Sequence, residues 1–163
     1  MDFIVDTDVV SMFCKIEKIA LLKRIFPYSK IYITQETTRE LERAKKLGFD
    51  YLDDVAEIIS VIELDKEVFE KSKKIAKNNE KLHLTEIYGI LLCKKKRMIM
   101  VTNDKVAKEF CRSIDVAWMD IVEILRFGFV KKRINKDESW KIIGEIEEKD
   151  KTRIKNAERI FEG

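Results

Sequence analysis

Short apolar runs alternate with longer amphipathic segments along most of the chain. The runs occupy residues 3–5, 31–33, 61–64, 98–101 and 116–118. Continuous apolar runs of this length, separated by helical segments, are typical of buried strands in a parallel sheet. The pattern therefore predicts an α/β fold, a three-layer α/β/α sandwich with a short central parallel sheet.

Between these runs, apolar residues recur at the spacing of helices. We predict helices over residues 7–16, 17–26, 35–47, 52–60, 66–77, 84–94 and 105–113. Thr34 and Asp65 are suited to cap the helices that follow them, and Gly48 suits the residue just after a helix.

The last part of the chain reads as two charged helices after Gly128. Its apolar residues recur at helical spacing: Trp140, Ile143, Ile146, Ile154, Ala157 and Phe161. We predict a main domain over residues 1–130 and a helical extension over residues 131–163. Because this stripe is larger than docking of a short tail needs, we also predict a homodimer, although packing on its own domain explains the stripe nearly as well.

The composition describes a globular protein with a highly charged surface. The chain has 163 residues, which is enough for one domain with a core, and 39% of them are charged. The net charge is only +3, so binding of nucleic acid needs a local basic patch. Three widely spaced cysteines and one histidine argue against a disulfide framework or a zinc site. Without an apolar run of membrane-spanning length, we expect a soluble, cytoplasmic protein.

Two aspartates follow two of the predicted strands. Asp6 ends the first run, and Asp104 comes two residues after Thr102, which ends the fourth. Each alone has an ordinary explanation, an Asx turn for Asp6 and a helix cap for Asp104. Ligands of open α/β sheets bind beyond the carboxyl ends of the strands, so the pair favours a functional site.

Two glutamates on predicted helices can add to this site. Glu40 borders the buried face of its helix, whereas Glu42 points away from that face. Glu86 lies at the start of a helix that is apolar nearly all round, where an unpaired carboxylate is costly. Glu36 shares a face with Glu40, but we expect it to be an ordinary surface residue.

A cluster of carboxylates without histidine or cysteine suits a hard, oxygen-seeking cation. Repulsion between the acids makes the empty cluster unfavourable, and a divalent ion relieves it. Such an ion lowers the pKa of a bound water and neutralises charge on a phosphate, as hydrolysis of a phosphodiester requires.

Four motifs resemble those of the PIN-domain nucleases, in the same order and over roughly residues 3–120. They are Ile4-Val5-Asp6-Thr7-Asp8, Arg39-Glu40-Leu41 after the second strand, Leu82-His83-Leu84-Thr85-Glu86, and Val101-Thr102-Asn103-Asp104. The chain departs from the family pattern at Asp8, where Ser or Asn is usual, at Thr85, where Gly is common, and in its long charged tail.

The resemblance implies a PIN-like fold and a ribonuclease that uses Mg²⁺ or Mn²⁺ to cut single-stranded RNA. It names Asp6, Glu40, Glu86 and Asp104 as the metal-binding acids, and Thr102 as a residue that positions a metal-bound water. The family includes toxins of toxin–antitoxin pairs, so an antitoxin protein is an expected partner.

Two alternatives stay open from the sequence. Asp6-x-Asp8 also has the form of the nucleophile motif of haloacid-dehalogenase-like phosphatases, in which Asp6 would attack phosphorus. A PIN scaffold that binds RNA or a partner without turnover is the other. The basic runs 94–97 and 131–133 are candidate phosphate contacts, although the first also suits the end of a helix.

Overall fold

A parallel five-stranded sheet forms the centre of the molecule. A computed structural model describes residues 1–50 and 52–162, and in that part the strands lie in the order β3-β2-β1-β4-β5. They are β1 (Phe3–Val5), β2 (Ile31–Ile33), β3 (Ser60–Val61), β4 (Ile99–Val101) and β5 (Trp118–Met119), and each neighbouring pair is parallel.

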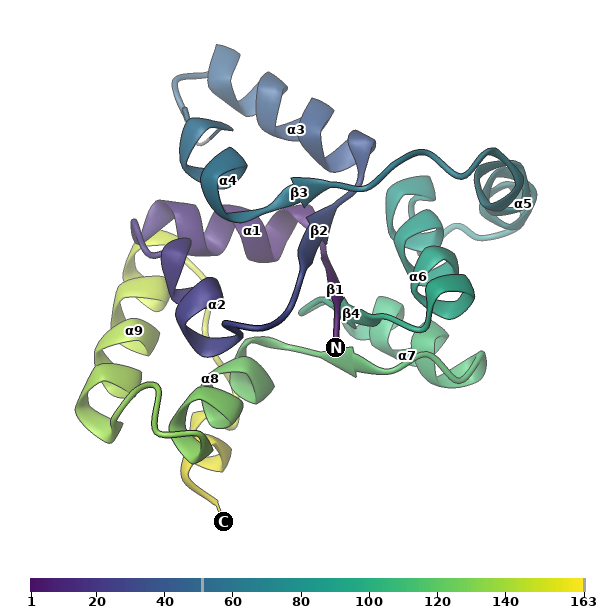
Figure 1. Cartoon of the computed structure of the whole chain (residues 1–163). Coiled ribbons are helices and arrows are strands. Elements are labelled where there is room, and N and C mark those ends of the chain that lie inside the picture. The colour runs from purple at the N-terminus through teal and green to yellow at the C-terminus, as the bar shows by residue number, and fades with distance from the viewer. Residues whose placement is uncertain (51, 163) are drawn as a thin grey trace.

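Helices cover both faces of this sheet (Figure 1). One layer contains α1 (Thr7–Lys15), α2 (Ala20–Ile25), α8 (Ile121–Val130) and α9 (Lys136–Lys149), and the other contains α5 (Lys66–Lys77), α6 (Leu84–Lys96) and α7 (Lys105–Ser113). The chain also forms α3 (Gln35–Lys46), α4 (Leu52–Ile58) and a final 3-10 helix, η1 (Ala157–Phe161). The predicted three-layer α/β/α sandwich with a short parallel sheet is confirmed.

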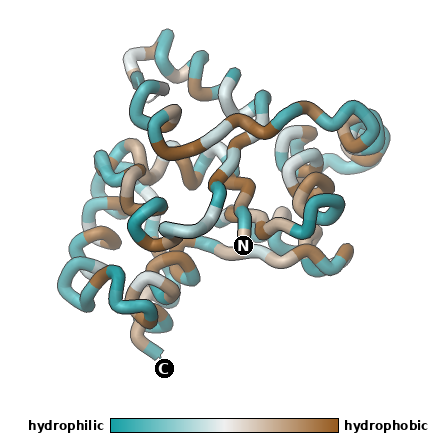
Figure 2. Tube along the Cα trace, viewed as in Figure 1, coloured by the Kyte–Doolittle hydropathy of each residue, from teal (hydrophilic) through white to brown (hydrophobic). Residues whose placement is uncertain are grey.

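The alternation of side chains along the central strand separates two hydrophobic clusters. Phe3 and Val5 of β1 point into the cluster under α1, α2, α8 and α9, whereas Ile4 points into the cluster under α5, α6 and α7. All three are 2% exposed or less. Apolar residues accordingly concentrate on the strands and inner helix faces, and polar residues on the outer faces (Figure 2). Burial on both faces explains why β1 is a continuous apolar run.

The register of β1 and β4 brings the two strand-ending acids to one edge. Val5 pairs with Val101, and the Asp6 amide donates to the Val101 carbonyl at 3.0 Å. Polar residues at this edge also cap the helices that begin there, because they satisfy amides left unpaired by the first turn. Asp6 caps α1, Thr34 caps α3 and Asp104 caps α7.

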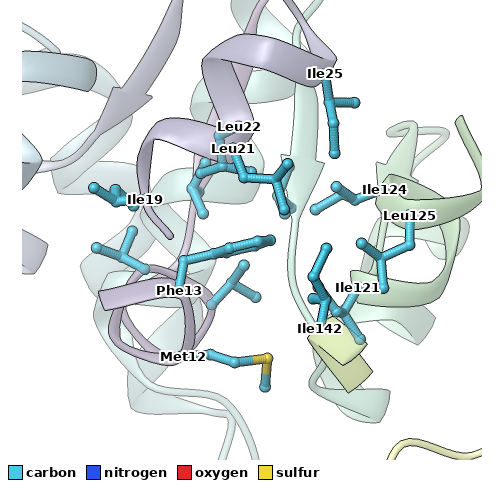
Figure 3. Close-up of a cluster of buried hydrophobic side chains, with 14 of the residues drawn as sticks. Met12, Phe13, Ile19, Leu21, Leu22, Ile25, Ile121, Ile124, Leu125 and Ile142 are labelled. Atoms are coloured by element: carbon cyan, nitrogen blue, oxygen red, sulfur yellow. The ribbon is translucent and has the colours of Figure 1, made fainter. Parts of the chain in front are cut away.

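The C-terminal helix is part of the main core. Ile142 of α9 is fully buried, and Figure 3 shows it beside Phe13 of α1 and beside Ile124 and Leu125 of α8. Residues 131–163 therefore share one hydrophobic cluster with residues 1–130.

Several boundaries differ from the sequence-based prediction. Helix α8 was not predicted, and the second tail helix is only the short η1. The helix predicted at 17–26 begins later, because Glu17 adopts a left-handed φ of 56° after α1. The fifth strand starts two residues late, because the Val116 amide still donates to the Cys111 carbonyl at the end of α7. The third strand is shorter than 61–64 and starts at Ser60.

The stripe that suggested a homodimer is largely used within one chain. Ile143, Ile146 and Ile154 are buried, and Phe161 packs its ring against Phe129. Trp140 is the exposed member of the stripe, at 45%, and its ring packs against that of Phe161.

Within the described residues, no helix is both long enough and apolar enough to span a bilayer.

Replacement of Ile142 by Ala tests whether the tail belongs to the core. A fully buried Ile shortened to Ala loses about 2–5 kcal/mol of unfolding free energy, and urea denaturation should show one cooperative transition. Lys141→Ala, at the exposed neighbouring position, should change this free energy by less than about 0.5 kcal/mol. Two separate transitions, or no loss in Ile142→Ala, would show that the tail folds independently.

Candidate active site

A pocket of about 160 Å³ opens at the carboxyl edge of the sheet, beside the ends of β1 and β2. Four acidic side chains line it: Asp6, Asp8, Glu40 and Glu86. Three of the four were named from the sequence as metal-binding acids, and Asp8 was noted as a departure from the family pattern. The fold therefore brings together acids that are up to 80 positions apart in the chain.

Asp6 is held at the base of α1 in an environment that opposes its charge. Its Oδ1 accepts from the Val9 amide at 2.9 Å, and the Thr102 hydroxyl also bonds its side chain. Burial, together with the charges of Asp8 and Glu86, raises the pKa of Asp6 from 3.8 to about 7, against the two hydrogen bonds, which lower it. Without a cation, burial therefore favours the protonated, uncharged form of this carboxyl group.

Glu40 reaches the pocket from the first half of α3. Its Oε2 accepts from the Thr7 hydroxyl, which also lies 3.2 Å from the Thr37 hydroxyl. Thr37 is in turn 3.3 Å from Thr34. Glu42 is exposed on another face of α3, as predicted, and Glu36 pairs with Arg39 away from the pocket.

Glu86 occupies the first turn of the buried helix α6. Its Oε2 accepts from the His83 amide at 2.9 Å, which completes a capping box. Burial raises the pKa of Glu86, and the charges of Asp104 and Asp8 act in the same direction. His83 is exposed and lines the rim of the pocket.

Asp104 does not line the pocket, yet its negative charge contributes to the raised pKa of Glu86. Its Oδ1 accepts from the Ala107 amide at 2.6 Å. The Thr102 hydroxyl oxygen accepts from the Asp104 amide at 3.1 Å and bonds the side chain of Asp6 as well. Fully buried Thr102 thus links the ends of β1 and β4 and fixes the two aspartates relative to each other.

Sequence reasoning did not single out the threonines that position Glu40. Thr34, Thr37 and Glu40 follow one another at intervals of three, which places them on adjacent turns of one helix face. That spacing was a usable signal, whereas the contact with Thr7 joins residues 33 positions apart and depends on the fold.

The donor chemistry of the pocket fits a hard divalent cation. The acids supply oxygen ligands only, and burial first, then the charges of neighbouring acids, raise the pKa values of Asp6 and Glu86. As the side chains stand among the described residues, no three of them gather closely enough to hold a metal ion. Each of the four predicted ligands is instead held by a hydrogen-bond donor of the protein.

Comparison with known proteins identifies the family. The family model described as DUF3368, a PIN domain, matches residues 2–159. The chain belongs to this PIN-domain family. A search of curated proteins gives no significant match.

Solved structures show the same fold for this PIN domain. VapBC-1 from nontypeable Haemophilus influenzae has a TM-score of 0.55 at 16% identity, over 74% of this chain and 98% of that one. A PilT N-terminus domain protein from the hyperthermophilic archaeon Sulfolobus solfataricus has a TM-score of 0.53 at 16% identity, over 79% of this chain and 94% of that one. At this identity the likeness establishes the architecture.

The raised pKa of Asp6 predicts that the metal-free PIN domain loses stability as the pH rises. The folded protein binds this proton more tightly than the unfolded chain, so the contribution is complete below about pH 4 and is lost as the pH rises through about 7. The difference between 3.8 and about 7 corresponds to roughly 4 kcal/mol at most.

Asp6→Asn is the matched variant, because Asn also caps a helix. In EDTA, chemical denaturation of both proteins from pH 4 to pH 8 should show the wild type losing several kcal/mol relative to Asp6→Asn. Parallel curves for the two proteins would contradict the assigned pKa.

Proposed function

We propose that this PIN domain is a ribonuclease that hydrolyses single-stranded RNA with Mg²⁺ or Mn²⁺. The observation that carries the proposal is the gathering of Asp6, Asp8, Glu40 and Glu86 around one pocket, where burial and neighbouring carboxylates raise the pKa of Asp6 to about 7. A protein that concentrates acids in a partly buried pocket sacrifices stability there, and a bound cation offsets that cost. Membership of the PIN family supports the same activity.

Asp6, Glu40, Glu86 and Asp104 would hold the metal. When bound, it would activate a water and neutralise charge on the scissile phosphate. The protein's own part is to position these acids: Thr7 holds Glu40, and the His83 amide holds Glu86. The family resemblance gives Thr102 the task of positioning a metal-bound water, and its burial favours acting through Asp6 and Asp104.

In the cell, the proposed ribonuclease would act as the toxin of a toxin–antitoxin pair. The fold is shared with VapBC-1, and an antitoxin protein would be the partner. The toxin role would place the protein in the cytoplasm, with the RNA that it cuts. The homodimer stays a prediction. The tail stripe supports it less strongly, because most of the stripe is buried within one chain.

The phosphatase alternative is less well supported. It would make Asp6 a nucleophile and leave Glu40 and Glu86 without a role, although both reach the pocket. The family match also favours a nuclease over that reading. A scaffold without turnover would not need its acids gathered at a site that raises their pKa values.

Cleavage of a labelled single-stranded RNA tests the proposal. Activity should require Mg²⁺ or Mn²⁺ and disappear in EDTA. Asp6→Asn and Asp104→Asn should each lower the rate by about 10² to 10⁴-fold, the scale for loss of one electrostatic or proton-transfer element. Both Asn residues keep the helix caps, so the fold should persist.

Glu40→Gln and Glu42→Gln form a matched pair on one helix. Glu40→Gln should lose activity, whereas Glu42→Gln should retain it, because Glu42 is exposed outside the pocket. Equal effects would overturn the assignment of Glu40. Full activity in EDTA would refute the metal mechanism, and binding of RNA without cleavage would favour the scaffold.

A further inference from the structure

A second and larger cleft adjoins the acid pocket. Its volume is about 710 Å³, and Asp8 lines both spaces. One wall comes from α1 and α7, and the other from the segment between α9 and η1, which contributes residues 152–156. This segment carries Arg153 and Lys155, both exposed. We refer to this space as the basic cleft.

The basic cleft concentrates the positive charge of the protein. Seven lysine and arginine side chains line it against three carboxylates, an excess of four. The whole chain has a net charge of only +3. The rest of the molecule is therefore close to neutral, and the cleft is the local basic patch that binding of nucleic acid requires.

Three of these cations already form ion pairs with carboxylates of the protein. Lys15 pairs with Asp150 at 2.5 Å, and Lys108 pairs with Asp120 at 3.0 Å. Arg159 pairs with Glu123 at 3.3 Å.

Others are available for a ligand. Arg153 and Lys155 form no ion pair within the described residues. Lys105 is 87% exposed and lies 3.9 Å from Glu109, a weak contact. Uncommitted cations on facing walls are suited to bind a chain of anions between them.

Trp118 adds an aromatic surface whose role is to hold cations. Lys108 Nζ lies 5.0 Å from its ring centroid, and the guanidinium carbon of Arg112 lies 4.9 Å from it. These contacts keep the two cations at the cleft. Because the ring is engaged in this way, the expected recognition is through phosphates and is independent of base identity.

We propose that the basic cleft binds the backbone phosphates of the single-stranded RNA on one side of the cut. Arg153 and Lys155 would contact two of these phosphates. The RNA would run from the basic cleft past Asp8 into the acid pocket. This path rests on the proposed nuclease function. The basic runs 94–97 and 131–133 line neither space.

RNA is favoured over an acidic protein segment by position. An RNA cut beside Asp6 must continue beyond the scissile phosphate, and the basic cleft begins at Asp8, which lines both spaces. The acids at this boundary would repel phosphates without a cation, so cations farther along the path offset that repulsion.

Binding of a labelled single-stranded RNA of 12 nucleotides to full-length Asp6→Asn protein tests the proposal without cleavage. Arg153→Ala/Lys155→Ala, added to this background, should raise the Kd by about 10-fold or more at low salt. The slope of log K against log salt should fall by about 1.4, which is about 0.7 for each phosphate contact on a single strand.

Lys71→Ala/Lys74→Ala is the matched control. Both lysines are exposed on α5, on the opposite side of the molecule from the C-terminal segment (Figure 1), and neither forms an ion pair within the described residues. This control should keep both the affinity and the salt slope of the parent protein. Equal losses in the two double variants, or no binding of RNA by the parent, would overturn the proposal.

Two further arms separate the outcomes. If a polyglutamate peptide, and not RNA, binds in a manner that depends on Arg153 and Lys155, the cleft accepts an acidic protein and the proposal is wrong. In the protein with Asp6 intact, the double variant should raise KM for RNA and leave kcat within about twofold. Absence of cleavage by that protein would refute the nuclease function, while the binding results would still decide on the cleft.

Discussion

Burial of carboxylates close to one another at the carboxyl edge of the sheet is the constraint on which the site depends. The strand order places β1 between β2 and β4, and the fold brings the charges of Asp8 on α1 and Glu86 on α6 close to Asp6. Burial and this crowding raise the pKa of Asp6 to about 7. The free energy that opposes ionisation there must be supplied by the remainder of the fold.

Two hydrophobic clusters and a set of helix caps supply the free energy that offsets this cost. The clusters fix both faces of β1, and the polar residues at the strand ends satisfy the first turns of α1, α3 and α7. Asp6 and Asp104 therefore have two roles, one in capping a helix and one in the acid cluster. Thr102 joins the two roles, because one buried hydroxyl contacts both aspartates.

The parallel sheet was predicted correctly because it leaves local signals, and three of the four acids named from the sequence line one pocket, whereas Asp104 does not. Apolar runs marked the strands, and Asp6, Glu40 and Glu86 stood at strand ends or helix faces that the fold then joined. The basic cleft was not predicted, since Arg153 and Lys155 lie in a segment between α9 and η1 that was predicted to be helical and is irregular. Helix α8 was missed, and the sequence left open whether the tail stripe packs within one chain or in a dimer, because burial against α1 and α8 is a long-range contact.

Direct binding of Mn²⁺ to the full chain, measured by calorimetry near pH 7, tests the central claim that the acid cluster is built for a divalent cation. The wild type should bind Mn²⁺ and release a fraction of a proton, seen as a dependence of the heat on the buffer, because the metal displaces the proton held by Asp6. Asp6→Asn should bind more weakly by 10-fold or more and release less of a proton. Equal binding and equal proton release by the two proteins would contradict the account.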